Sequence, residues 1–234
     1  MCGRYHLAAA PERLAQEFDL DVRENFPPRY NIAPTQPVHV VALGETRARR
    51  LALMRWGFVP SWAKKDYFEK VGSKPLINAR AETAAEKPVF RNAFKRRRCL
   101  LPADGFYEWS GAPGAKTPYR IRRKDEGLFA FAGLWETAID PDGGEIDTVA
   151  ILTTAAGADI APLHDREPVV IPRADYGKWL EADERDLAAA TAMLVARPAG
   201  FWTFQPVSKA VNNARNEGEK LAEALGFAAA PPAH

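Results

Sequence analysis

A cysteine stands directly after the first methionine, in the opening stretch MCGRY. Initiator methionine is normally removed before a small residue, so we expect the mature chain to begin with Cys2. Its α-amine and thiol have unperturbed pKa values of about 7.8 and about 8.5. A fraction of each group is therefore deprotonated and nucleophilic at neutral pH. An aldehyde would condense with the amine to a Schiff base, and the thiol would add to the imine carbon to close a five-membered thiazolidine. Because Cys2 lies near a chain end and away from apolar runs, we expect its role to be chemical rather than packing.

Three other segments place polar groups within apolar surroundings. In ADGFYEW, the Glu108 carboxyl lies among aromatic residues, which predicts a raised pKa and proton transfer near neutral pH, although a Glu on the wet face of an edge strand is an equal alternative. LINARAET and PLHDREP place Asn78 with Arg80, and His164 with Arg166, two residues apart. On extended segments each pair shares a face, so one member can bind a reacting centre while the guanidinium binds a phosphate. Taken alone, each pair is better explained as structural, with Asn78 satisfying a turn and Arg166 bridging to Asp165 or another acid.

This set suits an aldehyde that is masked as a cyclic hemiacetal, such as a sugar that has lost its base. His164 would protonate the ring oxygen, Glu108 would move protons at the amine, and Asn78 would hold a hydroxyl. Flanking phosphates would be bound by arginines, and exposed bases would stack on tryptophans, although tryptophans at this spacing are more often core residues. The candidates are Arg4, Arg80 and Arg166 for phosphates and Trp56 and Trp62 for bases.

The elements that must position these residues can be read from the pattern of apolar residues. Helical spacing occurs in four segments, 11–18, 87–97, 173–183 and 214–226. Between them lie short runs rich in β-branched and aromatic residues, and the turn DPDGGE at 140–145 predicts a hairpin. Because strands and helices do not alternate regularly, we predict an α+β fold, a single domain with mostly antiparallel, barrel-like β-sheets flanked by surface helices.

Composition excludes several other classes of protein. The net charge of +2 does not by itself indicate a nucleic-acid-binding protein, and no run approaches the roughly 18 apolar residues of a membrane span. No phosphate loop, dinucleotide fingerprint or C-x-x-C pair occurs, and the four histidines are scattered, so we expect no metal and no cofactor. Two cysteines without a secretory signal predict free thiols in the cytoplasm, in the region of the nucleoid.

Taken together, these segments resemble one known family. MCGRY, YNIAPTQ, WGFVPSWAKK, INARAETAAEKPVFRNAFKRRRCLLPADGFYEW, AGLWET, ILTTAA, PLHDREP and VNNARNE occur in the order seen in the SOS response-associated peptidase family of abasic-site processing proteins. The resemblance runs from Cys2 to about Asn216. It implies one abasic-site processing domain over residues 1–226, followed by a disordered tail at 227–234.

The resemblance also implies a function and a role for each matching residue. Family members bind single-stranded DNA and crosslink to abasic sites through the N-terminal cysteine as a thiazolidine, which shields the lesion. Cys2 corresponds to the nucleophile, Asn78 to the sugar-holding asparagine, Glu108 to the catalytic glutamate and His164 to the ring-opening histidine. The phosphate contacts correspond to Arg4, Arg80 and Arg166, and Thr153 to a further sugar contact.

Further activities and partners are implied in the same way. These are a lyase-like Schiff-base activity, autoproteolytic removal of the first residue and reversal of the crosslink. The implied partner is abasic single-stranded DNA at replication forks, bound by a monomer without a membrane. One departure from the family pattern is Glu167, whose carboxylate beside Arg166 would weaken DNA binding unless it points away from the groove.

Two other functions fit the same residues. In an N-terminal-nucleophile cysteine peptidase or amidohydrolase, Cys2 attacks an amide with its own amine or Glu108 as base, and peptide turnover without DNA would identify it. In a non-covalent reader of modified DNA, binding would be indifferent to Cys2→Ala and to the presence of an aldehyde. A crosslinking protein would instead form an adduct that resists detergent and is lost in Cys2→Ala.

Overall fold

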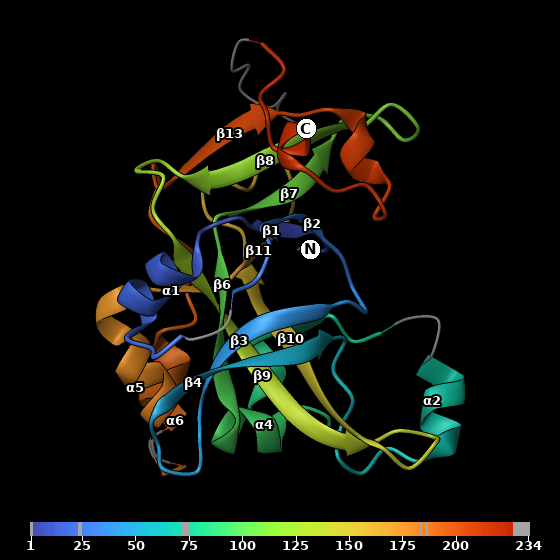
Figure 1. Ribbon diagram of the computed structural model, residues 1–234, viewed down its shortest axis with the longest axis vertical. Helices are drawn as coiled ribbons and strands as arrows, with labels where there is room; N and C mark the ends of the chain where they lie inside the picture. Colours follow the sequence, from blue (N-terminus) through green and yellow to red (C-terminus); the bar gives the residue numbers. More distant parts are fainter. Residues whose placement is uncertain (1, 23–24, 72–74, 183, 186, 227–234) are drawn as a thin grey trace.

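Two β-sheets carry most of the chain, and five strands of the larger sheet close into a barrel (Figure 1). The ring runs from strand to strand and back to its start through the pairing of β9 with β10. Its members are β3 (Pro37–Leu43), β4 (Arg49–Trp56), β10 (Glu145–Ala155), β9 (Phe129–Ile139) and β6 (Arg98–Ala103). This computed structural model describes residues 2–22, 25–71, 75–182, 184–185 and 187–226, so the predicted tail at 227–234 lies outside the described residues.

The smaller sheet has five strands and lies above the barrel in Figure 1. Its order is β13 (Trp202–Pro206), β8 (Thr117–Arg123), β7 (Gly105–Ser110), β1 (Tyr5–Leu7) and β2 (Arg29–Ile32). Because only Asp104 separates β6 from β7, one nearly continuous run of chain passes from the barrel into the smaller sheet. This passage brings β7, and with it Glu108, to the junction of the two sheets.

Three short strands extend the larger sheet beside β10 and β9. They are β5 (Asn78–Arg80), β11 (Arg166–Pro168) and β12 (Val170–Ile171). Among the pairings of the described strands, β10 runs parallel to β4 and to β5, and the others are antiparallel. Every residue of β6 is buried and most of β9 and β10 is, which explains the near-continuous apolar sequences of these strands, whereas β4 is partly exposed. The predicted α+β architecture is confirmed.

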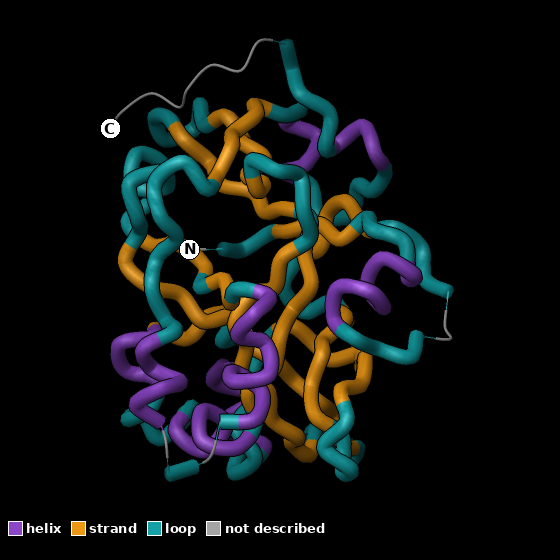
Figure 2. Tube along the Cα trace, turned by 90° about the vertical axis from the view of Figure 1, so that its left-hand side faces the viewer, coloured by secondary structure: helices purple, strands orange, loops and turns teal. Residues whose placement is uncertain are grey.

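Short helices cover the barrel, as Figure 2 shows at the end away from the smaller sheet. The predicted helices at 11–18, 87–97 and 173–183 are present as α1 (Pro11–Phe18), α4 (Arg91–Arg96) and α5 (Tyr176–Glu181). The sequence did not predict α2 (Lys65–Val71), α3 (Ala81–Ala84) or α6 (Leu187–Ala192). None of the helices in the described residues is long and apolar enough to cross a membrane.

The helix predicted at 214–226 is wrong. This part of the chain is a loop with a 3-10 turn, η3 (Glu219–Leu221), and is preceded by η2 (Lys209–Asn212). The buried Asn31 amide nitrogen donates to three carbonyls of the preceding loop, those of Val211, Asn213 and Asn216. Gly218 then has a φ of 112°, which a helix does not allow. These tertiary hydrogen bonds and the conformation of Gly218 therefore prevent residues 214–226 from forming the helix that their apolar spacing predicts.

Candidate functional site

The first residues of the chain lie alongside β7 in the smaller sheet. Tyr5 pairs with Phe106, and the Tyr107 backbone nitrogen donates to the Arg4 carbonyl at 2.9 Å. In this antiparallel register the chain start runs past Glu108, because each residue before Tyr5 lies opposite a residue after Phe106. The local pairing of β1 with β7 thus brings together Cys2 and Glu108, which are far apart in the sequence.

Glu108 is buried, with 5% of its surface exposed. β7 lies between β8 and β1 rather than at an edge, so the alternative of a solvent-facing glutamate on an edge strand is wrong. Burial raises the pKa of Glu108 to about 7, which confirms the raised pKa expected from its aromatic neighbours. Near neutral pH its carboxyl can therefore both accept and return a proton.

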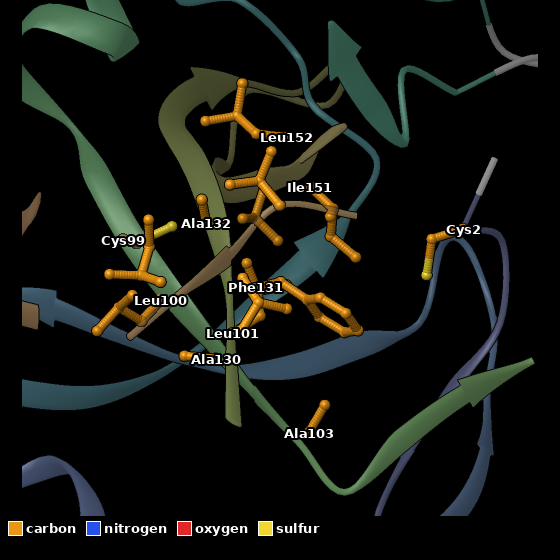
Figure 3. Close-up of a cluster of buried hydrophobic side chains, with 14 of the residues drawn as sticks. Cys2, Cys99, Leu100, Leu101, Ala103, Ala130, Phe131, Ala132, Ile151 and Leu152 are labelled. Carbon is orange, nitrogen blue, oxygen red and sulfur yellow. The ribbon is translucent and has the colours of Figure 1, made fainter. Parts of the chain in front are cut away.

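The Cys2 side chain is fully buried and belongs to the main hydrophobic core, so the expected absence of apolar neighbours was wrong. Figure 3 shows it at the margin of the cluster, apart from the labelled side chains around Phe131. Burial raises the pKa of the Cys2 thiol far above its usual range, and the Glu108 carboxylate raises it further. The thiol is therefore protonated at neutral pH. Its charge coupling to Glu108 shows that the two groups are neighbours.

Asn78 joins Cys2 directly. Its side-chain nitrogen donates to the Cys2 carbonyl at 2.9 Å, from the start of β5. Its Oδ1 is buried with no hydrogen-bond partner among the described residues. An unsatisfied buried acceptor is costly, and a sugar hydroxyl would satisfy it. Asn78 thus connects Cys2 to a position where a polar group could bind.

His164 lies in the loop before β11. The Arg166 backbone nitrogen donates to its Nδ1 at 3.0 Å, while an Asp165 carboxylate oxygen lies 2.6 Å from the same atom. The first contact needs a lone pair on Nδ1 and the second needs a proton there. Burial lowers the pKa of His164, and the Asp165 side chain is 84% exposed, so its charge is well screened. We therefore take His164 as neutral at pH 7, with its proton on Nε2.

A lysine that the sequence analysis did not consider lies near this group. Lys116 is exposed in the turn between β7 and β8, and its charge helps to lower the pKa of both Glu108 and His164. Because charge effects of this kind act over short distances, Glu108 and His164 both lie near Lys116. No sequence signal marks Lys116, since it lies in a polar turn.

Arg4 has partners within the protein. Its Nη1 donates to the Asn31 side-chain oxygen at 2.7 Å and to the Val211 carbonyl at 2.6 Å, and its guanidinium lies 5.8 Å from the Trp109 ring centre. These contacts tie the chain start to the loop that holds the predicted VNNARNE segment. Arg4 thus helps to position the chain start, and its phosphate contact stays a prediction.

Arg166 faces a carboxylate on the neighbouring helix. Its Nη1 and Nη2 donate to the two Glu82 oxygens at 2.6 and 2.8 Å, and Nη2 also donates to the Thr153 carbonyl at 2.5 Å. Thr153 is itself fully buried, so its predicted direct contact with a sugar is not possible in this structure. Glu82, which the sequence analysis missed, occupies the geometry in which a guanidinium binds phosphate.

The remaining predicted DNA contacts differ in exposure. Arg80 is exposed at the end of β5, with no ion-pair partner among the described residues. Trp62 is 53% exposed and meets Tyr67 edge to face. Trp56 is fully buried, and its Nε1 donates to the Ile77 carbonyl, so the prediction that it stacks on bases is wrong. A ring without exposed surface cannot receive a base.

Glu167 points away from Arg166. It is 1% exposed, and its two oxygens accept hydrogen bonds from the backbone nitrogens of Gly157 and Arg197 at 2.8 and 2.9 Å. Successive residues of a strand face opposite sides, so Arg166 and Glu167 cannot share a face of β11. Its carboxylate therefore holds two loops together and does not stand beside a phosphate-binding guanidinium.

Comparisons with known proteins identify the family of this chain and structures with a similar fold. The family model described as SOS response associated peptidase (SRAP) matches residues 1–214. The abasic site processing protein YoqW of Bacillus subtilis is 37% identical over 95% of this chain and 99% of that protein. The abasic site processing protein HMCES of Gallus gallus is 34% identical over 93% of this chain and 76% of that protein. A crystal structure from Bacteroides thetaiotaomicron shares the fold, with a TM-score of 0.83 at 21% identity over 96% of this chain and all of that one.

Proposed function

The chain belongs to the SOS response associated peptidase (SRAP) family, and from this membership and the geometry of the site we propose that it crosslinks to abasic sites in single-stranded DNA through Cys2. The observation that carries the proposal is the convergence of three groups at the chain start. Asn78 binds the Cys2 carbonyl, and the Glu108 charge acts on the Cys2 thiol. Removal of Met1 would free an α-amine beside a carboxyl whose pKa is matched to neutral pH.

The protonation states suggest an order of events. The Cys2 thiol is protonated at rest, so the α-amine attacks the aldehyde carbon first. Glu108 takes a proton from the amine and returns it as water leaves, which yields the Schiff base. The sulfur then adds to the same carbon, and Glu108 carries the thiol proton to the ring nitrogen, which completes the thiazolidine. The net reaction joins one aldehyde to one aminothiol with the loss of one water.

The other groups would act on the sugar and the backbone. The protonated fraction of His164 would donate its Nε2 proton to the ring oxygen as the hemiacetal opens and its hydroxyl proton passes to water. The unsatisfied Asn78 Oδ1 would accept from a sugar hydroxyl. Arg80 would bind a flanking phosphate and Trp62 would stack on a base. We propose that the protein acts as a monomer on the single-stranded DNA that replication forks expose.

A cysteine peptidase is less well supported by the same site. The nucleophile of such an enzyme is a thiolate, which requires a lowered pKa, whereas burial raises that of Cys2. A non-covalent reader would not need an amine and a thiol beside a carboxyl with a pKa of about 7. We retain lyase-like Schiff-base chemistry and self-removal of Met1 as parts of the proposal, since both would use Glu108.

The crosslinking rate should follow a bell-shaped pH profile with its rising limb near pH 7. Above about pH 7 Glu108 is ionised and can take the amine proton, whereas below that pH the carboxyl is protonated. At high pH Glu108 is rarely protonated and cannot protonate the hydroxyl that leaves as water, so the rate falls. Adduct formation timed from about pH 5 to about pH 9 checks this. A rate that keeps rising into alkali would contradict it.

Glu82→Gln should tighten the binding of undamaged single-stranded DNA by about two- to fivefold, because it weakens the ion pair that occupies Arg166. The freed guanidinium would then bind a phosphate and steepen the dependence of affinity on salt. Fluorescence anisotropy at several salt concentrations measures both. Glu86→Gln, an equal charge change at an exposed position, is the matched control. Weaker binding in Glu82→Gln would mean that Glu82 positions Arg166 for DNA.

A further inference from the structure

A small hollow outside the Cys2 site is lined by three arginines. It has a volume of about 170 Å³ and lies between the end of β8, β12 and the segment before β13. Arg123, Arg173 and Arg197 line it, together with apolar and aromatic residues that include Phe129 and Phe201. None of its lining residues is acidic. Three other hollows of the molecule differ, since carboxylates such as Asp104, Glu184 and Asp175 line them.

Two of these guanidiniums share one aromatic ring. The guanidinium carbons of Arg197 and Arg123 lie 4.9 and 5.7 Å from the Phe201 ring centre. Burial lowers the pKa of Arg197, and although Glu167 offsets this in part, the charge of Arg123 lowers it further. Two like charges are thus held close together by their contact with the same ring.

The donors of these arginines are only partly used. The Nε atoms of Arg123 and Arg197 are buried without a hydrogen-bond partner in the described part of the chain. Arg123 pairs with Asp125, and Arg173 lies 3.7 Å from Glu17. Arg197 forms no salt bridge within the residues that the structure describes, and both oxygens of its acidic neighbour Glu167 already accept backbone hydrogen bonds. Unsatisfied buried donors beside a like charge are costly, and an anion with several acceptor oxygens would satisfy them.

We propose that this hollow binds the terminal phosphate group of a phosphate monoester. The group carries about −1.5 to −2 charges near pH 7 and three acceptor oxygens, which suits neighbouring guanidiniums. A volume of 170 Å³ equals roughly five or six water molecules, enough for a phosphate but not for a whole nucleotide. The rest of the ligand would therefore lie outside, near Phe201. The ester is either a DNA end or a free nucleotide.

The test is calorimetric titration of the whole protein with inorganic phosphate. We expect saturable binding to the wild type. In Arg197→Gln we expect the affinity to fall by at least about tenfold, which corresponds to a loss of about 1.4 kcal/mol or more of binding free energy. Arg50→Gln, at an exposed arginine outside the hollow, is the matched control and should bind as the wild type does. Equal binding to wild type and Arg197→Gln, or no saturable binding to the wild type, would overturn the proposal.

Melting temperatures distinguish a loss of phosphate binding in Arg197→Gln from a loss of folding stability. Phosphate should raise the melting temperature of the wild type and of Arg50→Gln, but not that of Arg197→Gln. Without phosphate, Arg197→Gln should melt no lower than the wild type, because it removes a like charge beside Arg123. A clearly lower melting temperature would show that the guanidinium serves the fold and would contradict the proposal.

The source of the phosphate is identified with undamaged ligands. A short oligonucleotide with a 5′-phosphate, the same oligonucleotide with a 5′-hydroxyl, and a free deoxynucleoside monophosphate are titrated in parallel. Preference for the 5′-phosphate that is lost in Arg197→Gln identifies a DNA end, whereas binding of the free nucleotide alone identifies a small metabolite. Arg197→Gln should crosslink abasic DNA at the wild-type rate, so failure of this proposal is distinct from failure of the crosslinking proposal.

Discussion

Replacing Cys2 with alanine is expected to lower the yield of detergent-resistant adduct with abasic single-stranded DNA by on the order of a hundredfold or more. The variant keeps an α-amine and can still form a Schiff base, but without sulfur the imine carbon cannot be closed into a ring. The imine hydrolyses, so it should be seen only after borohydride reduction. Gel electrophoresis of the adduct with and without borohydride measures both species.

The matched control is Cys99→Ala. Cys99 is the other buried cysteine, on β6 of the barrel, and its thiol pKa is also raised by burial. It lies in the core and far along the chain from the chemistry, so this variant should crosslink like the wild type. A Cys2→Ala protein that still forms a heat-stable adduct without reductant would refute the role of the thiol.

Glu108→Gln is expected to slow crosslinking by about a hundredfold, at the lower end of what general acid–base catalysis contributes. Glutamine keeps the shape of the side chain but cannot carry protons between the amine, the leaving water and the thiol. The rising limb of the pH profile near pH 7 should disappear with it, because that limb reports the raised pKa of Glu108. Initial rates of adduct formation across the pH range test both effects.

Stability separates this loss of activity from misfolding. The folded-state pKa of Glu108 is raised, so the stability linked to its protonation is present at acid pH and is lost as pH rises through about 7. Glu108→Gln should therefore melt at or above the wild-type temperature at pH values above about 7, and the difference should shrink in acid. A variant that crosslinks as fast as the wild type would remove Glu108 from the mechanism.

The chemistry proposed for the site could be inferred from the sequence because it depends on residue types close together in the chain. An amine and a thiol on adjacent carbons need only Cys2 at the mature terminus, and the raised pKa of Glu108 follows from its apolar and aromatic neighbours. The β-rich fold was also predictable, since strands such as β6 and β9 are almost entirely buried and appear as apolar runs. Local composition fixes such features.

Long-range contacts decide what could not be predicted. Glu82 pairs with Arg166 across 84 residues, which changes a predicted phosphate contact into an occupied ion pair. Trp56 and Trp62 lie in one motif, yet one ring is fully buried and the other is 53% exposed, because β4 ends at Trp56 and turns its ring inward. The loop at 214–226 shows helical spacing but follows a segment held by the Asn31 amide. The spacing of residues in the sequence does not indicate which distant residues will contact one another.

The most direct test of the account is the intact mass of the protein before and after reaction with abasic single-stranded DNA. The account predicts a free protein without Met1 and an adduct equal to protein plus DNA less one water, stable without reductant. Protein that keeps Met1 and nevertheless captures the DNA in full yield would contradict it, because Cys2 would then have no free α-amine to attack the aldehyde.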